Sequence, residues 1–213
     1  MKVEIWSDVV CPWCYIGKRR FEEALAGFEG AGDVEVVWRS FELDPDAPRT
    51  QSGTSIEHLA RKYGLSPDQA RASQEHVTRV ASEEGLDYRL ADLRRGNSFD
   101  AHRLLHLARE HGKQDALKER LLRAYFSEGQ PIGEPAVLEQ LAVEVGLDRT
   151  EVAETLASDR FGEDVRDDER SARLLGIRGV PFFVFDDRYG IEGAQPAESI
   201  LQALRNARSP ASI

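Results

Sequence analysis

Asp8-Val9-Val10-Cys11-Pro12-Trp13-Cys14-Tyr15-Ile16-Gly17-Lys18 is the stretch that decides the fold, and Cys11 and Cys14 are the only cysteines of the chain. Before it, apolar and polar side chains alternate over residues 3–7, which predicts a strand. Cys11 then stands at the N-cap of a predicted helix, and Pro12 occupies the first turn, where a missing N–H costs nothing. The helix continues through apolar side chains at helical spacing: Phe21, Ala24, Leu25 and Phe28.

A Cys-x-x-Cys pair at a helix start is suited to thiol–disulfide exchange. The thiolate is the nucleophile, and the free N–H groups of a helix N-terminus stabilise a negative sulfur. We therefore expect Cys11 to be exposed, to have a lowered pKa and to form a mixed disulfide that the more buried Cys14 resolves. Pro12 stiffens the turn and Trp13 adds no positive charge, so the pair is not expected to be an extreme oxidant.

Two other interpretations of the cysteines stay open. A structural disulfide between neighbouring helical positions would close a very small loop and so remove little entropy from the unfolded state. A zinc site is the second alternative, because His102 and His106 have the spacing of a ligand pair on a helix. Zinc fingers keep their two halves much closer in sequence than these residues are. Redox use is therefore the favoured interpretation.

A second segment, Gly176-Ile177-Arg178-Gly179-Val180-Pro181-Phe182-Phe183-Val184-Phe185-Asp186, places an apolar, aromatic strand directly after a proline. Together with the Cys-Pro-Trp-Cys motif, this segment resembles the thioredoxin superfamily. The resemblance implies a cis peptide bond before Pro181, which would lie against the cysteine pair. It also implies that the backbone of Val180 pairs with an extended substrate peptide or with glutathione. The alternative is a trans proline that merely begins a strand, since few X–Pro bonds in folded proteins are cis.

The rest of the chain indicates strands near both ends and a long helical stretch between them. Further strands are expected over 34–41, 182–185 and 189–192. Capped starts and terminating glycines predict helices near 55–63, 67–84, 98–111, 114–127, 135–145, 149–157, 160–175 and 196–207. This order resembles an α/β thioredoxin fold with a large all-helical insertion. We expect residues 1–50 and 159–213 to form the thioredoxin-like domain and residues 51–158 the inserted helical domain.

This order and two motifs resemble the DsbA-like family over essentially the whole chain. The motifs, Ser7–Lys18 and Asn97–Leu104, are similar to those of the FrnE-type cytosolic branch. That branch is related to 2-hydroxychromene-2-carboxylate isomerases and kappa-class glutathione transferases. The resemblance places the insertion over the active-site face, where Asn97 and His102 would hold a polar substrate or glutathione. From spacing alone, His102 and His106 are expected on a partly solvated flank of their helix.

Both cysteines are present, whereas the glutathione-using relatives usually carry serine at the first position, and this difference favours dithiol chemistry. We expect a thiol–disulfide oxidoreductase with Cys11 as nucleophile and Cys14 as resolving thiol. Its substrate site is expected to include Pro12, Trp13, Val180, Pro181, Asn97 and His102. A glutathione-dependent isomerase or transferase acting on a small aromatic compound is the alternative enzyme. A redox-sensing or holdase-type binding module is the non-enzymatic alternative.

Composition and charge limit the partners. The 213 residues are 41% hydrophobic and 31% charged, as in a soluble protein with a sizeable core. The net charge of −10 argues against a nucleic-acid partner. The first strand follows Met1 directly, without an apolar signal segment or candidate membrane span, which predicts a cytoplasmic protein. We expect a disulfide-containing protein or small thiol as partner, no metal or bound organic cofactor, and glutathione as candidate co-substrate or reductant. The glutathione-using relatives suggest a homodimer.

Overall fold

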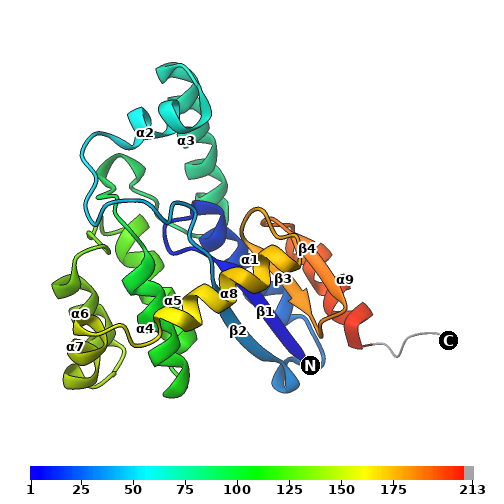
Figure 1. Ribbon diagram of the computed structural model, residues 1–213. Helices are drawn as coiled ribbons and strands as arrows, with labels where there is room; N and C mark the ends of the chain where they lie inside the picture. The colour runs from blue at the N-terminus through cyan, green and yellow to red at the C-terminus, as the bar shows by residue number, and fades with distance from the viewer. Residues whose placement is uncertain (209–213) are drawn as a thin grey trace.

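A mixed β-sheet lies at the centre of the molecule (Figure 1). The computed structural model describes residues 1–208, and within them the sheet has four strands in the order β2-β1-β3-β4. The strands are β1 (Lys2–Ser7), β2 (Glu35–Ser40), β3 (Phe182–Phe185) and β4 (Tyr189–Glu192). β2 runs parallel to β1, whereas β3 is antiparallel to both β1 and β4. Segments from the two ends of the chain therefore meet in one sheet.

β1 is buried on both sides because helices cover both faces of the sheet. The covering helices are α1 (Pro12–Ala26), α8 (Gly162–Leu174) and α9 (Ala197–Arg208). Val3 and Ile5 point to the face covered by α1 and α9. Trp6 points to the opposite face and packs with Ala172 of α8. Side chains that alternate along β1 therefore contribute to two separate apolar cores, one on each face of the sheet.

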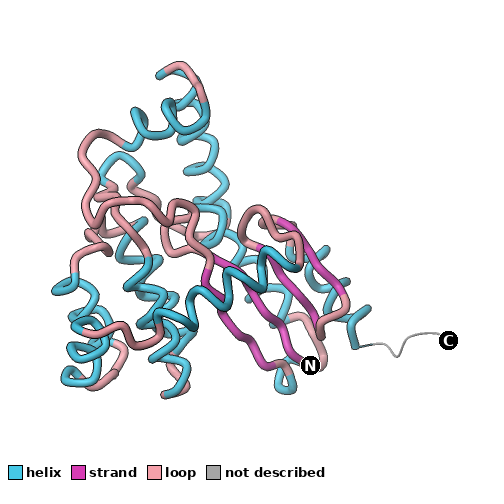
Figure 2. The backbone as a smooth tube through the Cα atoms, viewed as in Figure 1, coloured by secondary structure: helices cyan, strands magenta, loops and turns pink. Residues whose placement is uncertain are grey.

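The chain between β2 and α8 is helical. Its helices are α2 (Ser55–Tyr63), α3 (Pro67–Glu83), α4 (Phe99–Glu110), α5 (Gln114–Phe126), α6 (Pro135–Glu144) and α7 (Arg149–Ala157). Short 3-10 turns occur at Ala31–Asp33 and Leu90–Asp92. Figures 1 and 2 show α2 and α3 as an arm beyond one end of the sheet, with α4 to α7 gathered beside the strands. Helices α3 to α7 share an apolar core with Tyr15 and Ile16 of α1.

Local signals explain where these helices start and stop. At the start of α2, the Thr54 hydroxyl accepts from the Glu57 N–H, and the Glu57 carboxylate accepts from the Thr54 N–H. Ser66 and Gln69 form the same reciprocal pair at the start of α3. α2 stops at Gly64, whose φ of 65° lies in the left-handed region that favours glycine.

The predicted strands and helices are confirmed to within about two residues at either end. Helices α2 to α7 lie within residues 51–158, and the strands lie outside that range. No helix among residues 1–208 is both long and apolar enough to cross a membrane.

Candidate active site

Cys11 and Cys14 lie at the junction of β1 and α1. Cys11 is the N-cap of α1, with extended backbone angles (φ −92°, ψ 114°), and Pro12 follows at the first helical position. The Cys14 N–H donates to the Cys11 carbonyl at 3.0 Å, which places both cysteines in one helical turn. Both thiols are free. The Cys11 side chain is 4% exposed and that of Cys14 is fully buried.

The loop before β3 covers the cysteine pair. The peptide bond between Val180 and Pro181 is cis, which confirms the prediction. The Cys11 Sγ lies 3.5 Å from the Val180 carbonyl oxygen and donates a hydrogen bond to it. The expectation of an exposed Cys11 sulfur is therefore wrong, because this loop closes over it. A Cβ on Gly17 would lie 2.8 Å from the Pro181 Cγ, so glycine is what lets α1 approach the proline this closely.

The two thiols titrate as a pair, and their order is the reverse of the prediction. The hydrogen bond with Cys14, followed by burial, raises the pKa of the Cys11 thiol well above its ordinary value. Burial opposes the charged form of Cys14 too. However, the hydrogen bond with Cys11 and the charge of Lys118 outweigh burial and lower the pKa of Cys14. A helix N-terminus favours a thiolate in its first turn, and here the hydrogen bond with Cys11, followed by the charge of Lys118, favours the charged form of Cys14.

Lys118 is a site residue that sequence reasoning missed. It lies on α5, its side chain is fully buried, and its Nζ donates to the Ser7 carbonyl oxygen at 3.3 Å. Burial lowers the pKa of Lys118 to about 8, against the opposing charges of Cys14 and Asp8. A signal was present in the sequence, because Lys118 stands one turn before Leu121 and Leu122 on the apolar side of α5.

Asp8 and His102 form a buried pair behind the cysteines. The Asp8 carboxylate lies 3.3 Å from the His102 Nε2 and accepts from the Leu43 N–H at 2.8 Å. Burial opposes the charge of Asp8, but the hydrogen bond and charge of His102, together with the hydrogen bonds from Leu43 and Ser98, outweigh burial and lower the pKa of Asp8. Burial lowers the pKa of His102 as well. Asp8 thereby ties the loop that precedes Cys11 to the segment after β2.

The prediction that His102 and His106 lie on a partly solvated flank of α4 is wrong. His102 is fully buried and His106 is 9% exposed, because α5, α7 and α8 all pack against α4. The His106 Nε2 lies 3.0 Å from the Ser40 Oγ and 3.3 Å from an Asp168 carboxylate oxygen. The prediction assumed that only the apolar stripe of the helix is buried, whereas α4 is buried on more than one face.

Asn97 and His102 were expected to hold substrate, and the structure gives both of them protein partners. The Asn97 Nδ2 donates to the Pro45 carbonyl at 3.3 Å, and its Oδ1 accepts from the Phe99 N–H at 2.8 Å. Neither Asn97 nor His102 lines the cavity that lies beside Cys11. The hydrogen bonds of Asn97 and His102 hold neighbouring loop segments in place.

A cavity of about 700 Å³ opens beside the cysteine pair. Cys11, Pro12, Trp13 and Val180 line it, whereas Cys14 does not. The far wall comes from α2, α3 and the segment before α4. Three predicted substrate-site residues therefore share one cavity with Cys11.

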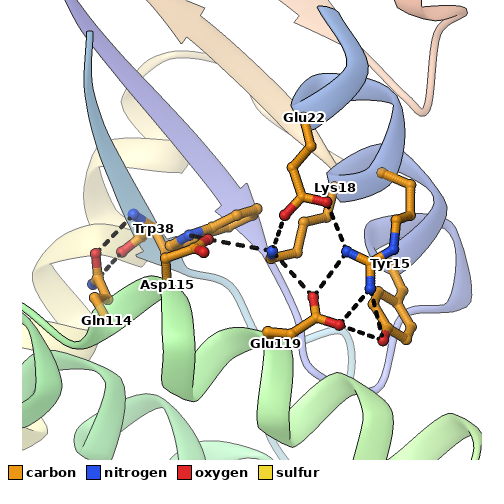
Figure 3. A network of polar contacts seen from close by, with 8 residues as sticks. Tyr15, Lys18, Glu22, Trp38, Gln114, Asp115 and Glu119 are labelled. Atoms are coloured by element: carbon orange, nitrogen blue, oxygen red, sulfur yellow. Dashed lines mark hydrogen bonds and ion pairs between the residues drawn. The ribbon is translucent and has the colours of Figure 1, made fainter. Parts of the chain in front are cut away.

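A polar network holds α5 against α1 and β2 (Figure 3). Its labelled members are Tyr15, Lys18, Glu22, Trp38, Gln114, Asp115 and Glu119. The Lys18 Nζ lies 3.1 Å from Glu119 and 3.4 Å from Asp115, and it also pairs with Glu22. The Gln114 side chain exchanges hydrogen bonds with the Trp38 backbone at 3.0 and 2.9 Å. This anchoring places Lys118, on the same helix, beside Cys14.

No three His, Cys, Asp or Glu side chains gather as a metal site in the described part of the chain. The sequence matches the DSBA-like thioredoxin domain over residues 2–205. The chain belongs to this family. The predicted DsbA-like fold, an α/β thioredoxin fold with a helical insertion, is thereby confirmed.

Relatives of this DSBA-like protein cover nearly its whole length. It is 31% identical over 198 residues to YwbO, an uncharacterised protein of Bacillus subtilis (strain 168), with 87% of this chain and 86% of YwbO aligned. A probable DsbA oxidoreductase from Streptomyces coelicolor has 47% identity and a TM-score of 0.93, over 100% of this chain and 93% of that one. DsbM, a cytosolic disulfide reductase from Pseudomonas aeruginosa solved with glutathione, shares the fold, with 19% identity, a TM-score of 0.67 and coverage of 97% and 98%.

The family is one of DsbA-like thiol oxidoreductases, and this member has its two cysteines close together at the start of a helix.

Proposed function

We propose that this protein is a thiol–disulfide exchange enzyme in which Cys11 is the attacking sulfur and Cys14 the resolving one. The observation that carries the proposal is that only one of the two cysteines borders the cavity. Cys11 lines the cavity, whereas Cys14 is fully buried behind it. A substrate disulfide can meet Cys11 first, and Cys14 can then reach the Cys11 sulfur from within the same helical turn.

The lowered pKa belongs to Cys14 and the raised one to Cys11, so the pair favours a thiolate at Cys14 over one at Cys11. Transfer of the Cys11 proton to the Cys14 thiolate produces the attacking thiolate at Cys11. The Cys11 thiolate attacks the substrate disulfide, forms a mixed disulfide and releases one thiolate. Cys14 then gives its proton to the released thiolate, with Lys118 stabilising the Cys14 anion, and attacks the Cys11 sulfur of the mixed disulfide. The second substrate sulfur leaves as a thiolate. The products are an intramolecular disulfide and the two substrate halves as one thiol and one thiolate, so two electrons pass from protein to substrate.

The pair must be returned to its starting state by a second thiol or disulfide. We propose that the protein works in the cytoplasm and that glutathione or another small thiol reduces it. DsbM, which has the same fold, is named a cytosolic disulfide reductase and was solved with glutathione, and it supports this assignment. Reduction by two thiols would reverse the two steps above and release one disulfide. The substrate would be a protein or a small molecule that contains a disulfide.

A Cys14→Ser variant tests the assignment of roles. Because its mixed disulfide cannot be resolved, we expect one substrate adduct per chain on Cys11, detected by intact mass and peptide mapping. The matched Cys11→Ser variant should form no stable adduct, since its remaining sulfur is buried. Turnover of disulfide substrate should be lost in both variants. An adduct on Cys14 of the Cys11→Ser chain, or full turnover by either variant, would contradict the proposal.

A glutathione-dependent isomerase acting on a small compound is the second candidate function. The cavity beside Cys11 has the size of a small-molecule site and favours it. Such a reaction has no net redox change and needs no resolving thiol. Isomerase activity that survives in the Cys14→Ser chain would establish this candidate, whereas its absence from the unmodified protein would remove it.

A further inference from the structure

The cavity beside Cys11 has a positive wall that the exchange steps do not use. Lys62, Arg95 and Arg178 line it, against one acidic side chain, Asp44, among the described lining residues. The chain as a whole carries a net charge of −10. A cavity whose charge is opposite to that of its protein attracts anions and raises their local concentration.

Arg95 is the one of these three cations that has buried donors without partners among the described residues. Its Nε and Nη1 are buried and have no hydrogen-bond partner within residues 1–208. Its Nη2 reaches the Ser52 carbonyl at 3.5 Å, the limit of a hydrogen bond. Buried donors without partners are costly. A guanidinium offers a carboxylate two edges, Nε with Nη2 and Nη1 with Nη2, and each edge includes one of the two unpartnered nitrogens of Arg95. Arg95 therefore lacks an acceptor that a carboxylate would supply.

The rest of the cavity is suited to an apolar body. Its apolar and aromatic lining includes Trp13, Leu43, Leu59, Val77, Leu90 and Tyr125. Ligand pockets of this size, mostly apolar with a few polar groups, bind small molecules, and the polar groups fix their orientation. The sulfur of Cys11 lies in the same wall as Trp13.

We propose that this cavity selects small organic disulfides and thiols that carry a carboxylate. Arg95 binds the carboxylate, the apolar wall holds the body, and the substrate sulfur lies at Cys11. The inference rests on the proposed function, because it names the substrate class of the same cysteine pair.

Two aryl disulfides of different charge provide the test: dianionic dithiobis(nitrobenzoate) and neutral dithiodipyridine. Because the same two reagents are used with every variant, their other differences cancel in the comparison. With either one, the Cys11 thiolate attacks the disulfide, forms a mixed disulfide and releases one aryl thiol. Cys14 then displaces the second aryl thiol, so that each chain loses two electrons and yields two aryl thiols. Absorbance of the released thiol gives the second-order rate constant.

The ratio of the two rate constants, anionic over neutral, measures the selectivity. We expect Arg95→Gln to lower this ratio about tenfold to a hundredfold, as for loss of a charged hydrogen bond. Arg94→Gln is the matched control, since it removes the same charge from the neighbouring, exposed residue. Its ratio should stay within about twofold of the unmodified value, because salt screens exposed charges. Equal ratios in all three proteins, or equal losses in the two variants, would overturn the inference.

A binding measurement separates this inference from the proposed function. In the Cys11→Ser background, thionitrobenzoate binding is measured by calorimetry, and we expect addition of Arg95→Gln to weaken it at least about tenfold. Unchanged binding would overturn the inference whatever the cysteines do. If the unmodified protein reacts with neither aryl disulfide at Cys11, the proposed function fails. If it reacts with both and the ratio is independent of Arg95, this inference alone fails.

Discussion

Lys118 belongs to α5 of the helical insertion, and its buried side chain places a positive charge near the sulfur of Cys14. Burial lowers the pKa of Lys118 to about 8 from an ordinary 10.5. Between these values the unfolded chain binds more protons at this residue than the folded chain does. The contribution of Lys118 to the free energy of unfolding therefore rises with pH over this window, by up to about 3 kcal/mol.

The Lys118→Met variant tests this linkage. Methionine matches the length of the side chain but carries no proton, so the variant should lack this rise in stability. We expect the unfolding free energy of the unmodified protein to increase relative to that of Lys118→Met as the pH rises above 8. Urea unfolding of both proteins between pH 7 and pH 10 measures the difference. Parallel pH profiles would show that Lys118 titrates normally in the folded chain.

At the residue scale, the sequence predicted the cysteine pair and Pro181 because motifs carry them. Lys118 and the pair of Asp8 and His102 were not predicted as a cluster. Their contacts join the loop before α1 to α4 and α5, far along the chain, and neither periodicity nor capping reports on such contacts. The predicted order of the thiol pKa values was wrong, because it depends on the hydrogen bond between the two cysteines and on the charge of Lys118, which a motif does not report.

At the scale of elements, the approach of α1 to the loop before β3 sets the position of Cys11. An alanine Cβ at residue 17 would lie 2.8 Å from the Pro181 Cγ, which belongs to a rigid ring. Gly17→Ala gains about 1 kcal/mol of helix propensity, but overpacking costs about 1–3 kcal/mol. We expect a net loss of unfolding free energy in urea titrations, together with slower thiol exchange as α1 is displaced.

Gly27→Ala is the matched control, at the other end of the same helix. Its added Cβ would lie 3.6 Å from the nearest atom, a Leu201 methyl carbon, and its φ of −86° is compatible with alanine. This variant should keep both stability and exchange rate. If Gly17→Ala is as stable as Gly27→Ala and exchanges at the same rate, the close approach of α1 to Pro181 does not constrain the site.

Elements were predicted well where local chemistry defines them. The reciprocal caps at Thr54 and Ser66 mark the starts of α2 and α3, and Gly64 marks an end. What periodicity could not give is how many faces of a helix are buried. α4 contacts α5, α7 and α8, so His106 is buried although it lies off the main apolar stripe.

At the scale of the whole molecule, the sheet and the helical insertion build the site together. The sheet and α1 supply the cysteines and the loop with Pro181, while the insertion supplies Lys118, His102 and the far wall of the cavity. The order of elements was predictable from the sequence. The cavity and the unpartnered Nε and Nη1 of Arg95 were not, because they depend on how the insertion packs across Cys11.

The central claim is that Cys11 and Cys14 form a working dithiol couple. The direct measurement is the redox equilibrium of the unmodified protein in graded glutathione buffers, followed by thiol labelling and intact mass. We predict a reversible intramolecular disulfide whose midpoint lies in the cellular range, between about −220 and −320 mV. A pair that stays reduced throughout, or that stops at a glutathione adduct on Cys11, would contradict the account.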